Sequence, residues 1–124
     1  MRLLVVVGIG GFIGTVSRYL ISRFFELSYG SVFPWGTLIV NILGSLLLGI
    51  IIGISEKGNF MNQEVRLFLT VGICGGFTTF SSLSYDAFNL LRQQDWIRFS
   101  LYASLSMFLG LLAIYFGRLL IKVI

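Results

Sequence analysis

The stretch GICGGFTTFSS, residues 72–82, lies within a long apolar segment that has no charged residue between Leu67 and Tyr85. Adjacent glycines followed by β-branched and hydroxyl side chains form a poor continuous helix. We therefore predict that a membrane helix over residues 62–93 is broken in the middle of this stretch. At membrane depth such a break is tolerated only where its backbone is buried in protein or lines a water-filled cavity, so the break is a candidate functional site.

Three further apolar segments surround this one, at residues 3–25, 34–55 and 96–123, and each is close to the ~20 residues that cross a bilayer. The chain has 124 residues, of which 56% are hydrophobic and 11% are charged. A soluble domain of this size has too much surface to hide such a composition. We predict an all-α membrane protein with four transmembrane helices in a single domain, residues 1–124.

Small residues recur at a spacing of four in the first two segments. Gly10 and Gly14 form a G-x-x-x-G face, and Ser45, Gly49 and Gly53 share one face of the second segment. Such faces let two helices approach closely in lipid, which predicts two packing seams.

The charge distribution bears on topology. The net charge is +4, but the basic residues are scattered among helix ends, which is typical of interfacial anchors and not of a nucleic-acid surface. With four spans, one membrane side holds five Lys and Arg residues and the other holds four: Arg2, Lys57, Arg66, Arg118 and Lys122 against Arg18, Arg23, Arg92 and Arg98. Because orientation follows the excess of such residues, our hypothesis is that the chain inserts both ways and pairs as an antiparallel, dual-topology dimer. The alternative is that the small difference fixes one orientation.

Catalytic chemistry has little support in the sequence. The chain contains no histidine, and no span holds a pair of carboxylates for acid–base work. Its only cysteine, Cys74, has no histidine to activate it, and no cluster has the spacing of a metal enzyme. We therefore predict that the protein is not an enzyme.

Polar and aromatic residues near the break are candidates for ion binding. Asn41 lies within the second span, where its amide N–H groups could donate either to an anion or to another helix. Freed N–H groups at a helix break favour an anion, whereas freed carbonyls favour a cation. The ring edges of Phe77 and Phe80 are positive and could support a small anion, the alternative being packing in lipid or core.

Two more features fit an anion pathway. Arg18 lies deep for a charged residue, where it could snorkel to the interface or raise the anion concentration in a vestibule. Tyr102, Ser106 and Gly110 form a stripe on the last span. Hydroxyl donors on this stripe could replace the water shell of an anion, although serines in membrane helices also bond their own backbone.

Three motifs carry a resemblance that covers essentially the whole chain. They are GGFIG at residues 10–14 followed by Arg18, GTLIVN at residues 36–41 followed by Gly44, and GGFTTFS at residues 75–81. In this order and at these spacings, the chain resembles the Fluc fluoride channels, also called the CrcB family. The resemblance implies a passive fluoride-selective channel that exports fluoride across a bacterial inner membrane. It also implies an antiparallel homodimer with pores at the subunit interface.

The same resemblance implies roles for individual residues. Arg18 matches the family's vestibule arginine, and a sodium ion at the dimer centre would be held by the backbone carbonyls of Gly75 and Thr78. The positions implied for the fluoride pathway are Thr37, Asn41, Phe80, Ser81, Tyr102 and Ser106.

Two residues depart from the family pattern. Leu83 stands where a second pore phenylalanine is expected, and Asp86 stands where glutamate is expected. A leucine offers no positive ring edge. The departure at Leu83 keeps open a heterodimer with a paralogous chain.

Two other functions are compatible with the length and charge balance. A small dual-topology, proton-coupled multidrug exporter needs a carboxylate within the membrane, but the first span has only Glu26, at its far end. A membrane subunit with no transport of its own is the second alternative. Neither accounts for the predicted break together with Asn41.

Overall fold

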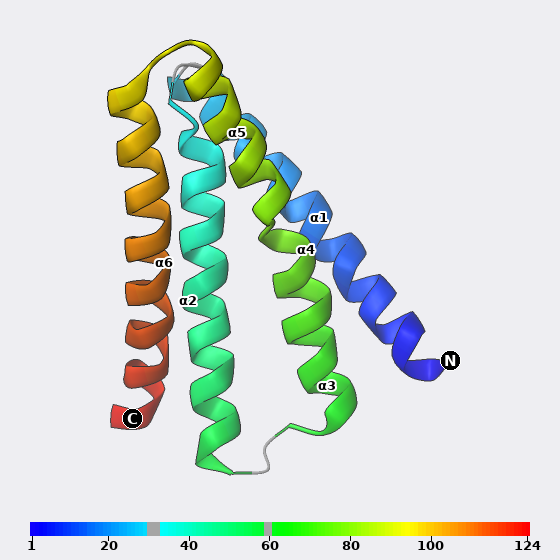
Figure 1. Cartoon of the computed structure of the whole chain (residues 1–124). Helices are drawn as coiled ribbons and strands as arrows, with labels where there is room; N and C mark the ends of the chain where they lie inside the picture. The colour runs from blue at the N-terminus through cyan, green and yellow to red at the C-terminus, as the bar shows by residue number, and fades with distance from the viewer. Residues whose placement is uncertain (30–32, 59–60) are drawn as a thin grey trace.

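The computed structural model describes residues 1–29, 33–58 and 61–124, and the elements in these ranges are all helical (Figure 1). Their bounds are α1 Arg2–Tyr29, α2 Trp35–Lys57, α3 Gln63–Leu67, the π-helix η1 Phe68–Cys74, α4 Gly75–Phe77, α5 Phe80–Arg92 and α6 Trp96–Val123.

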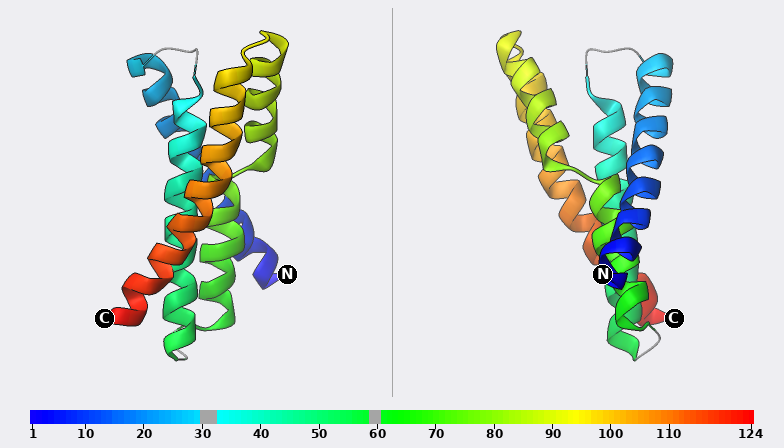
Figure 2. Two further views of the ribbon diagram at one scale, coloured as in Figure 1. Left: turned by 60° about the vertical axis from the view of Figure 1, so that its left-hand side comes forward. Right: turned by 90° about the vertical axis from the view of Figure 1, so that its right-hand side faces the viewer.

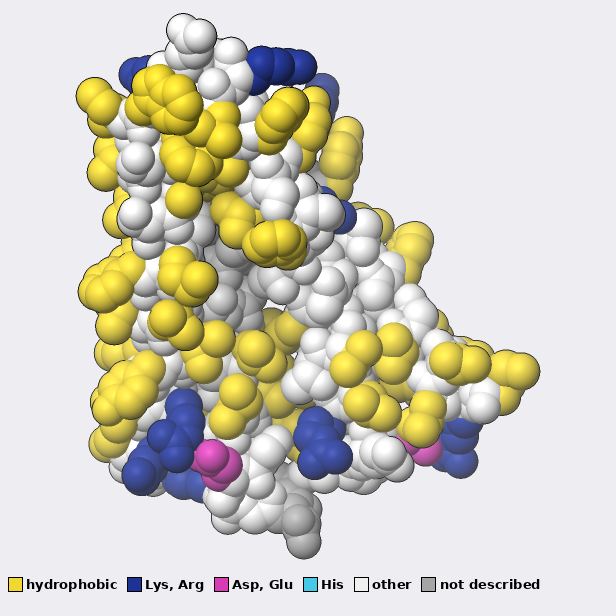
Figure 3. All heavy atoms as spheres, in the orientation of Figure 1, with side chains coloured by type: hydrophobic (Ala, Val, Ile, Leu, Met, Phe, Trp, Pro, Cys, Tyr) yellow, Lys and Arg dark blue, Asp and Glu magenta, His cyan; other side chains and the backbone are white. Residues whose placement is uncertain are grey.

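Four helical stretches are long and apolar enough to cross a membrane. They are Arg2–Ser28, Trp35–Lys57, Gln63–Arg92 and Trp96–Val123. Hydrophobic side chains cover most of the face seen in Figure 3, and Lys and Arg gather toward its two ends. This exposure is expected of a protein whose solvent is lipid, where apolar side chains need no burial. The chain is therefore an all-helical, multi-pass membrane protein.

The main helix contacts join alternate spans. α2 and α6 run side by side in the same direction, and α1 lies along η1 and α4, also in the same direction (Figures 1 and 2). Both termini, the end of α2 and the start of α3 lie toward one end of the molecule (Figure 1). α5 leans away from α2 toward its connection with α6, which opens the other end of the bundle (Figure 2).

Glycines bring these helices into backbone contact. A Cβ atom placed on Gly14 would meet the carbonyl oxygen of Ile73 in η1, and one on Gly49 would meet the carbonyl oxygen of Ile114 in α6. Only glycine permits such an approach, which maximises the van der Waals contact that holds helices together in lipid. The predicted seams on the first and second spans are the faces that make these contacts.

The third span changes conformation along its length. It begins with Asn62, whose side chain accepts a hydrogen bond of 2.8 Å from the Val65 N–H. It then passes through the wider π-helix before α4 ends at Phe77. Thr78 (φ −103°, ψ 143°) and Thr79 (φ −149°, ψ 133°) are extended, and α5 begins at Phe80.

A small apolar cluster fixes the upper part of the bundle. Leu38, Leu90 and Tyr102 are buried together, and Leu83 packs against them. The turn that leads into α6 is closed by Asp95, whose carboxylate accepts hydrogen bonds from the Arg98 backbone at 3.2 Å and from its guanidinium at 2.7 Å. The bond from the guanidinium holds the pKa of Asp95 below its ordinary value.

Candidate functional site

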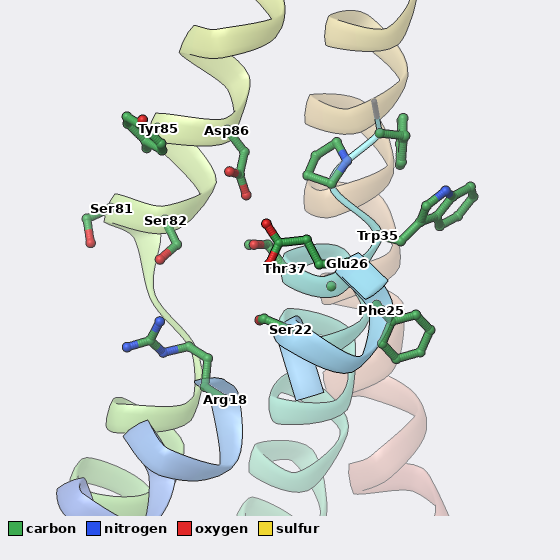
Figure 4. Close-up of a pocket in the computed structure, with 13 residues that line it drawn as sticks. Arg18, Ser22, Phe25, Glu26, Trp35, Thr37, Ser81, Ser82, Tyr85 and Asp86 are labelled. Atoms are coloured by element: carbon green, nitrogen blue, oxygen red, sulfur yellow. The ribbon is translucent and has the colours of Figure 1, made fainter. Parts of the chain in front are cut away.

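Two cavities are lined by different faces of α5, the helix that follows the extended residues Thr78 and Thr79. The first, which we call the vestibule, has a volume of about 410 Å³ and opens between the end of α1, the start of α2 and α5 (Figure 4). Polar and charged side chains line much of it: Arg18, Ser22, Glu26, Thr37, Ser81, Ser82, Tyr85 and Asp86.

Arg18 is tied to the helix break. Its Nε donates a hydrogen bond of 3.2 Å to the carbonyl oxygen of Gly76 in α4. In Figure 4 the guanidinium lies beside the link from α4 to α5, on the same side of the cavity as Ser82. A positive charge is therefore held in the vestibule close to backbone that has left the helix.

A hydrogen-bonded polar group in the vestibule wall joins three helices, α2, α5 and α6. The Tyr102 hydroxyl donates a hydrogen bond of 3.4 Å to Oδ2 of Asp86. The Thr37 side chain lies within hydrogen-bonding reach of both. Tyr102 is fully buried and, within a single chain, is not among the residues that line either cavity. The structure therefore brings Thr37 and Ser81 to the vestibule with Arg18 and holds Tyr102 behind that wall.

The second cavity, which we call the groove, has a volume of about 540 Å³ and lies between α2, α5 and α6. Figure 3 shows the surface hollowed in this region. The groove contains three residues that the resemblance assigns to the fluoride pathway, Asn41, Phe80 and Ser106. Thr78, one of the two residues assigned to sodium, also lines it.

A hydrogen bond from the helix break fixes the orientation of the Asn41 amide group. Its Oδ1 accepts a hydrogen bond of 3.4 Å from the backbone N–H of Thr79. A backbone N–H can only donate, so the side-chain atom that faces it must be the oxygen. The Nδ2 end of the amide, which carries two N–H donors, is thereby turned away from Thr79.

Two other groove residues present groups of the kind that could contact an anion. Phe80 is 79% exposed, so both ring edges and faces are accessible. The Ser106 hydroxyl oxygen is buried, and no described residue supplies it with a hydrogen-bond partner. Unpaired buried hydroxyls are costly, so the hydrogen-bonding capacity of Ser106 is left unused within the single chain.

Carbonyl oxygens at the break are the right chemical type for a hard cation. In a continuous helix the Thr79 N–H would donate to the carbonyl of Gly75, but here it donates to Asn41. The carbonyl of Thr78 precedes the first residue of α5 and lies outside its hydrogen-bond ladder. The family resemblance implies sodium at these two carbonyls, and their release from helix bonding is compatible with that expectation.

The acidic residues of the vestibule were not placed in the site from sequence. Asp86 was considered only as a departure from the family pattern, and Glu26 only for its place at the end of the first span. The signal that could have found Asp86 is a carboxylate inside a membrane span, which marks a functional position by default. Glu26 gave no such signal because it lies near the helix end.

Comparisons with known proteins give the family. A family model described as "CrcB-like protein, Camphor Resistance (CrcB)" matches residues 5–118. The chain is 47% identical over 111 residues to a protein of Thermus thermophilus named "Fluoride-specific ion channel FluC", covering 90% of this chain and 87% of that protein. It is 48% identical over 120 residues to a Bacteroides fragilis protein of the same name, covering 94% of each. A Methanosarcina acetivorans protein named "Fluoride-specific ion channel FluC 1" is 38% identical over 119 residues, covering 96% of this chain and 90% of that protein. The chain therefore belongs to the CrcB family.

Proposed function

We propose that the chain is a passive, fluoride-selective ion channel, and not an enzyme, that exports fluoride across the inner membrane of the cell. Family membership and the names of its relatives support this function. They favour a channel over the proton-coupled exporter and the non-transporting subunit that the sequence left open.

The observation that carries the proposal is the donor set of the groove. Asn41 turns its N–H groups away from Thr79, and Ser106 has a buried hydroxyl without a partner in the described residues. Beside them Phe80 exposes positive ring edges. A small anion that sheds its water needs such donors, and no full positive charge lines the groove to trap it there.

The proposed fluoride pathway connects the vestibule with the groove. Arg18 attracts fluoride to the vestibule, where Thr37 and Ser81 offer hydroxyl groups. Asn41, Phe80 and Ser106 are proposed to contact fluoride in the groove. The Tyr102 hydroxyl, which lies beside Asp86 and Thr37, is also proposed to belong to the fluoride pathway.

The working unit is proposed to be an antiparallel homodimer with dual topology. The groove is open in the single chain, and exposing its few polar side chains, such as Asn41, to lipid is costly. A second copy would cover it, and the near balance of five against four basic residues permits both orientations. A terminal tag that is accessible from only one face of the membrane would contradict dual topology.

Leu83 bears on whether the channel is a homodimer or a heterodimer. It packs against the cluster of Leu38, Leu90 and Tyr102 while also lining the groove. A pore formed by two copies would have no second phenylalanine at this position. A heterodimer with a paralogous chain would supply that ring, and conduction by the purified chain alone decides between the two.

Sodium is proposed as a structural ion at the dimer centre. The carbonyls of Gly75 and Thr78 from two copies would hold it. The ion would supply positive charge that holds together backbone segments whose carbonyls otherwise repel one another.

The experiment is fluoride efflux from liposomes that contain the purified chain, followed with a fluoride electrode in the presence of a potassium ionophore. We expect rapid fluoride release and no chloride release from matched vesicles. Absence of fluoride release from folded protein, with or without a paralogous partner, would overturn the proposed function.

A further inference from the structure

We infer that Glu26 limits the rate at which anions reach the vestibule, so that its carboxylate is a conduction-setting residue of this channel. The inference rests on the proposed function, because it assigns the vestibule to the fluoride pathway.

The first observation is the position of the Glu26 carboxylate in the vestibule. Figure 4 shows its carboxylate directed across the cavity toward the side formed by α5. The Asp86 carboxylate points into the same space, and the two acidic groups interact electrostatically. Glu26 is therefore part of the cavity wall although it lies near the end of α1.

The second observation is the sum of the charges that line the vestibule. Among the described residues, the charged side chains that line the vestibule are one guanidinium, from Arg18, and two carboxylates, from Glu26 and Asp86. With all three ionised, these residues sum to one negative charge, which opposes an anion that approaches the cavity. Charges in a cavity with low-dielectric walls act more strongly than on an open surface.

The two carboxylates differ in their hydrogen-bond partners. Asp86 accepts a hydrogen bond from Tyr102, so its replacement would also disturb a buried contact. Glu26 is solvent-exposed and has no ion pair or hydrogen bond with any residue in the described ranges. No described residue forms an ion pair with it, so its replacement changes the field with little effect on packing.

The test compares Glu26→Gln with the parent protein in planar bilayers, with fluoride as the only permeant anion and gluconate added to set ionic strength. At about 0.01 M ionic strength we expect the fluoride current through each channel to rise about two- to tenfold in Glu26→Gln. Glu26→Ala should behave in the same way, and Glu26→Asp should stay near the parent because it keeps the charge. At about 1 M, where the Debye length is about 3 Å, the ratio should approach one.

Asp95→Asn is the matched control. It removes the same charge from a residue outside the vestibule, and asparagine retains the side-chain oxygen that caps α6. We expect its current to equal that of the parent.

The outcomes separate this inference from the proposed function. Equal currents for the parent and both neutral Glu26 variants at low ionic strength would overturn the inference while the channel stands. A ratio that does not change with ionic strength would also overturn it, because the effect would then be one of packing. A parent protein that carries no fluoride would overturn the proposed function and this inference with it.

Discussion

The backbone N–H of Thr79 donates to Oδ1 of Asn41, so one hydrogen bond of 3.4 Å joins the break in the third span to the first third of α2. This bond takes the N–H from the carbonyl of Gly75 and sets the direction of the Asn41 amide. One contact therefore releases a carbonyl at the break and orients a donor in the groove. The predictions below test the groups that this arrangement exposes.

Asn41→Asp should abolish most fluoride passage. The carboxylate can still accept from Thr79, but it replaces two N–H donors with a negative charge. At a separation of about 4 Å and an effective dielectric of about 20, repulsion of a second anion is about 4 kcal/mol, so a loss of more than about tenfold is expected in liposome efflux. Asn89→Asp, outside both cavities, is the control and should conduct normally. Normal efflux from Asn41→Asp would remove Asn41 from the pathway.

Phe80→Ile should reduce fluoride current about fivefold, since ring-edge interactions contribute about 1 kcal/mol. Phe80 is 79% exposed, so the change should leave the fold of the chain intact. Phe88 lies on the same helix, is 56% exposed and lines neither cavity, so Phe88→Ile is a matched control. Currents that fall equally in the two variants would show that the effect is not specific to the groove.

Ser106→Ala should lower fluoride current about tenfold, because a hydrogen bond to a charged group contributes about 1.5–3 kcal/mol. The change should not destabilise the protein, since the hydroxyl has no partner in the described part of the chain. Ser104→Ala removes a hydroxyl from an exposed position outside the groove and should conduct as the parent does. A fall in stability without a fall in current would show that Ser106 has a structural partner instead.

Gly14→Ala should destabilise the packing of α1 on η1, because its Cβ would meet the carbonyl oxygen of Ile73. Overpacking of this kind costs about 1–3 kcal/mol. Unfolding in mixed detergent micelles, followed by circular dichroism, measures the loss. Gly8→Ala is the control, because its Cβ would have nothing within 4 Å. Equal stability of the two variants would mean that the contact relaxes without cost.

Replacing sodium with a large organic cation during purification should weaken the proposed dimer. The carbonyls of Gly75 and Thr78 from two copies would then face one another without a charge between them. Crosslinking in detergent at graded sodium concentrations measures the dimer fraction. A dimer fraction that does not respond to sodium would count against the ion site.

The four spans were predictable from sequence because lipid imposes a simple rule of length and apolarity. The uncharged run from Pro34 to Ser55 begins at the N-cap of α2 and ends inside that helix, and the helical stretch from Gln63 to Arg92 agrees with the third span within one residue at each end. Glycine seams were predictable for a similar reason, since only the smallest residue allows backbones to touch.

The partition of the site into two cavities was not predictable. It depends on how Thr78 and Thr79 turn the chain, which sends Ser81 toward the vestibule and the neighbouring Phe80 toward the groove. The hydrogen bond from Arg18 to Gly76 and the π-helix also depend on the approach of α1, and no local pattern encodes that distance. Tyr102 shares a sequence stripe with Ser106, yet only Ser106 lines the groove.

The pairing of alternate spans has a consequence for biogenesis. Gly14 finds its partner Ile73 only after the third span has been synthesised, and Gly49 finds Ile114 only with the last. Until then the first two helices persist in the bilayer as hydrogen-bonded rods that contact each other where Gly36 meets Ser22. Assembly of the bundle is consequently a late event, and a nascent chain truncated before η1 should expose both glycine faces to membrane quality control.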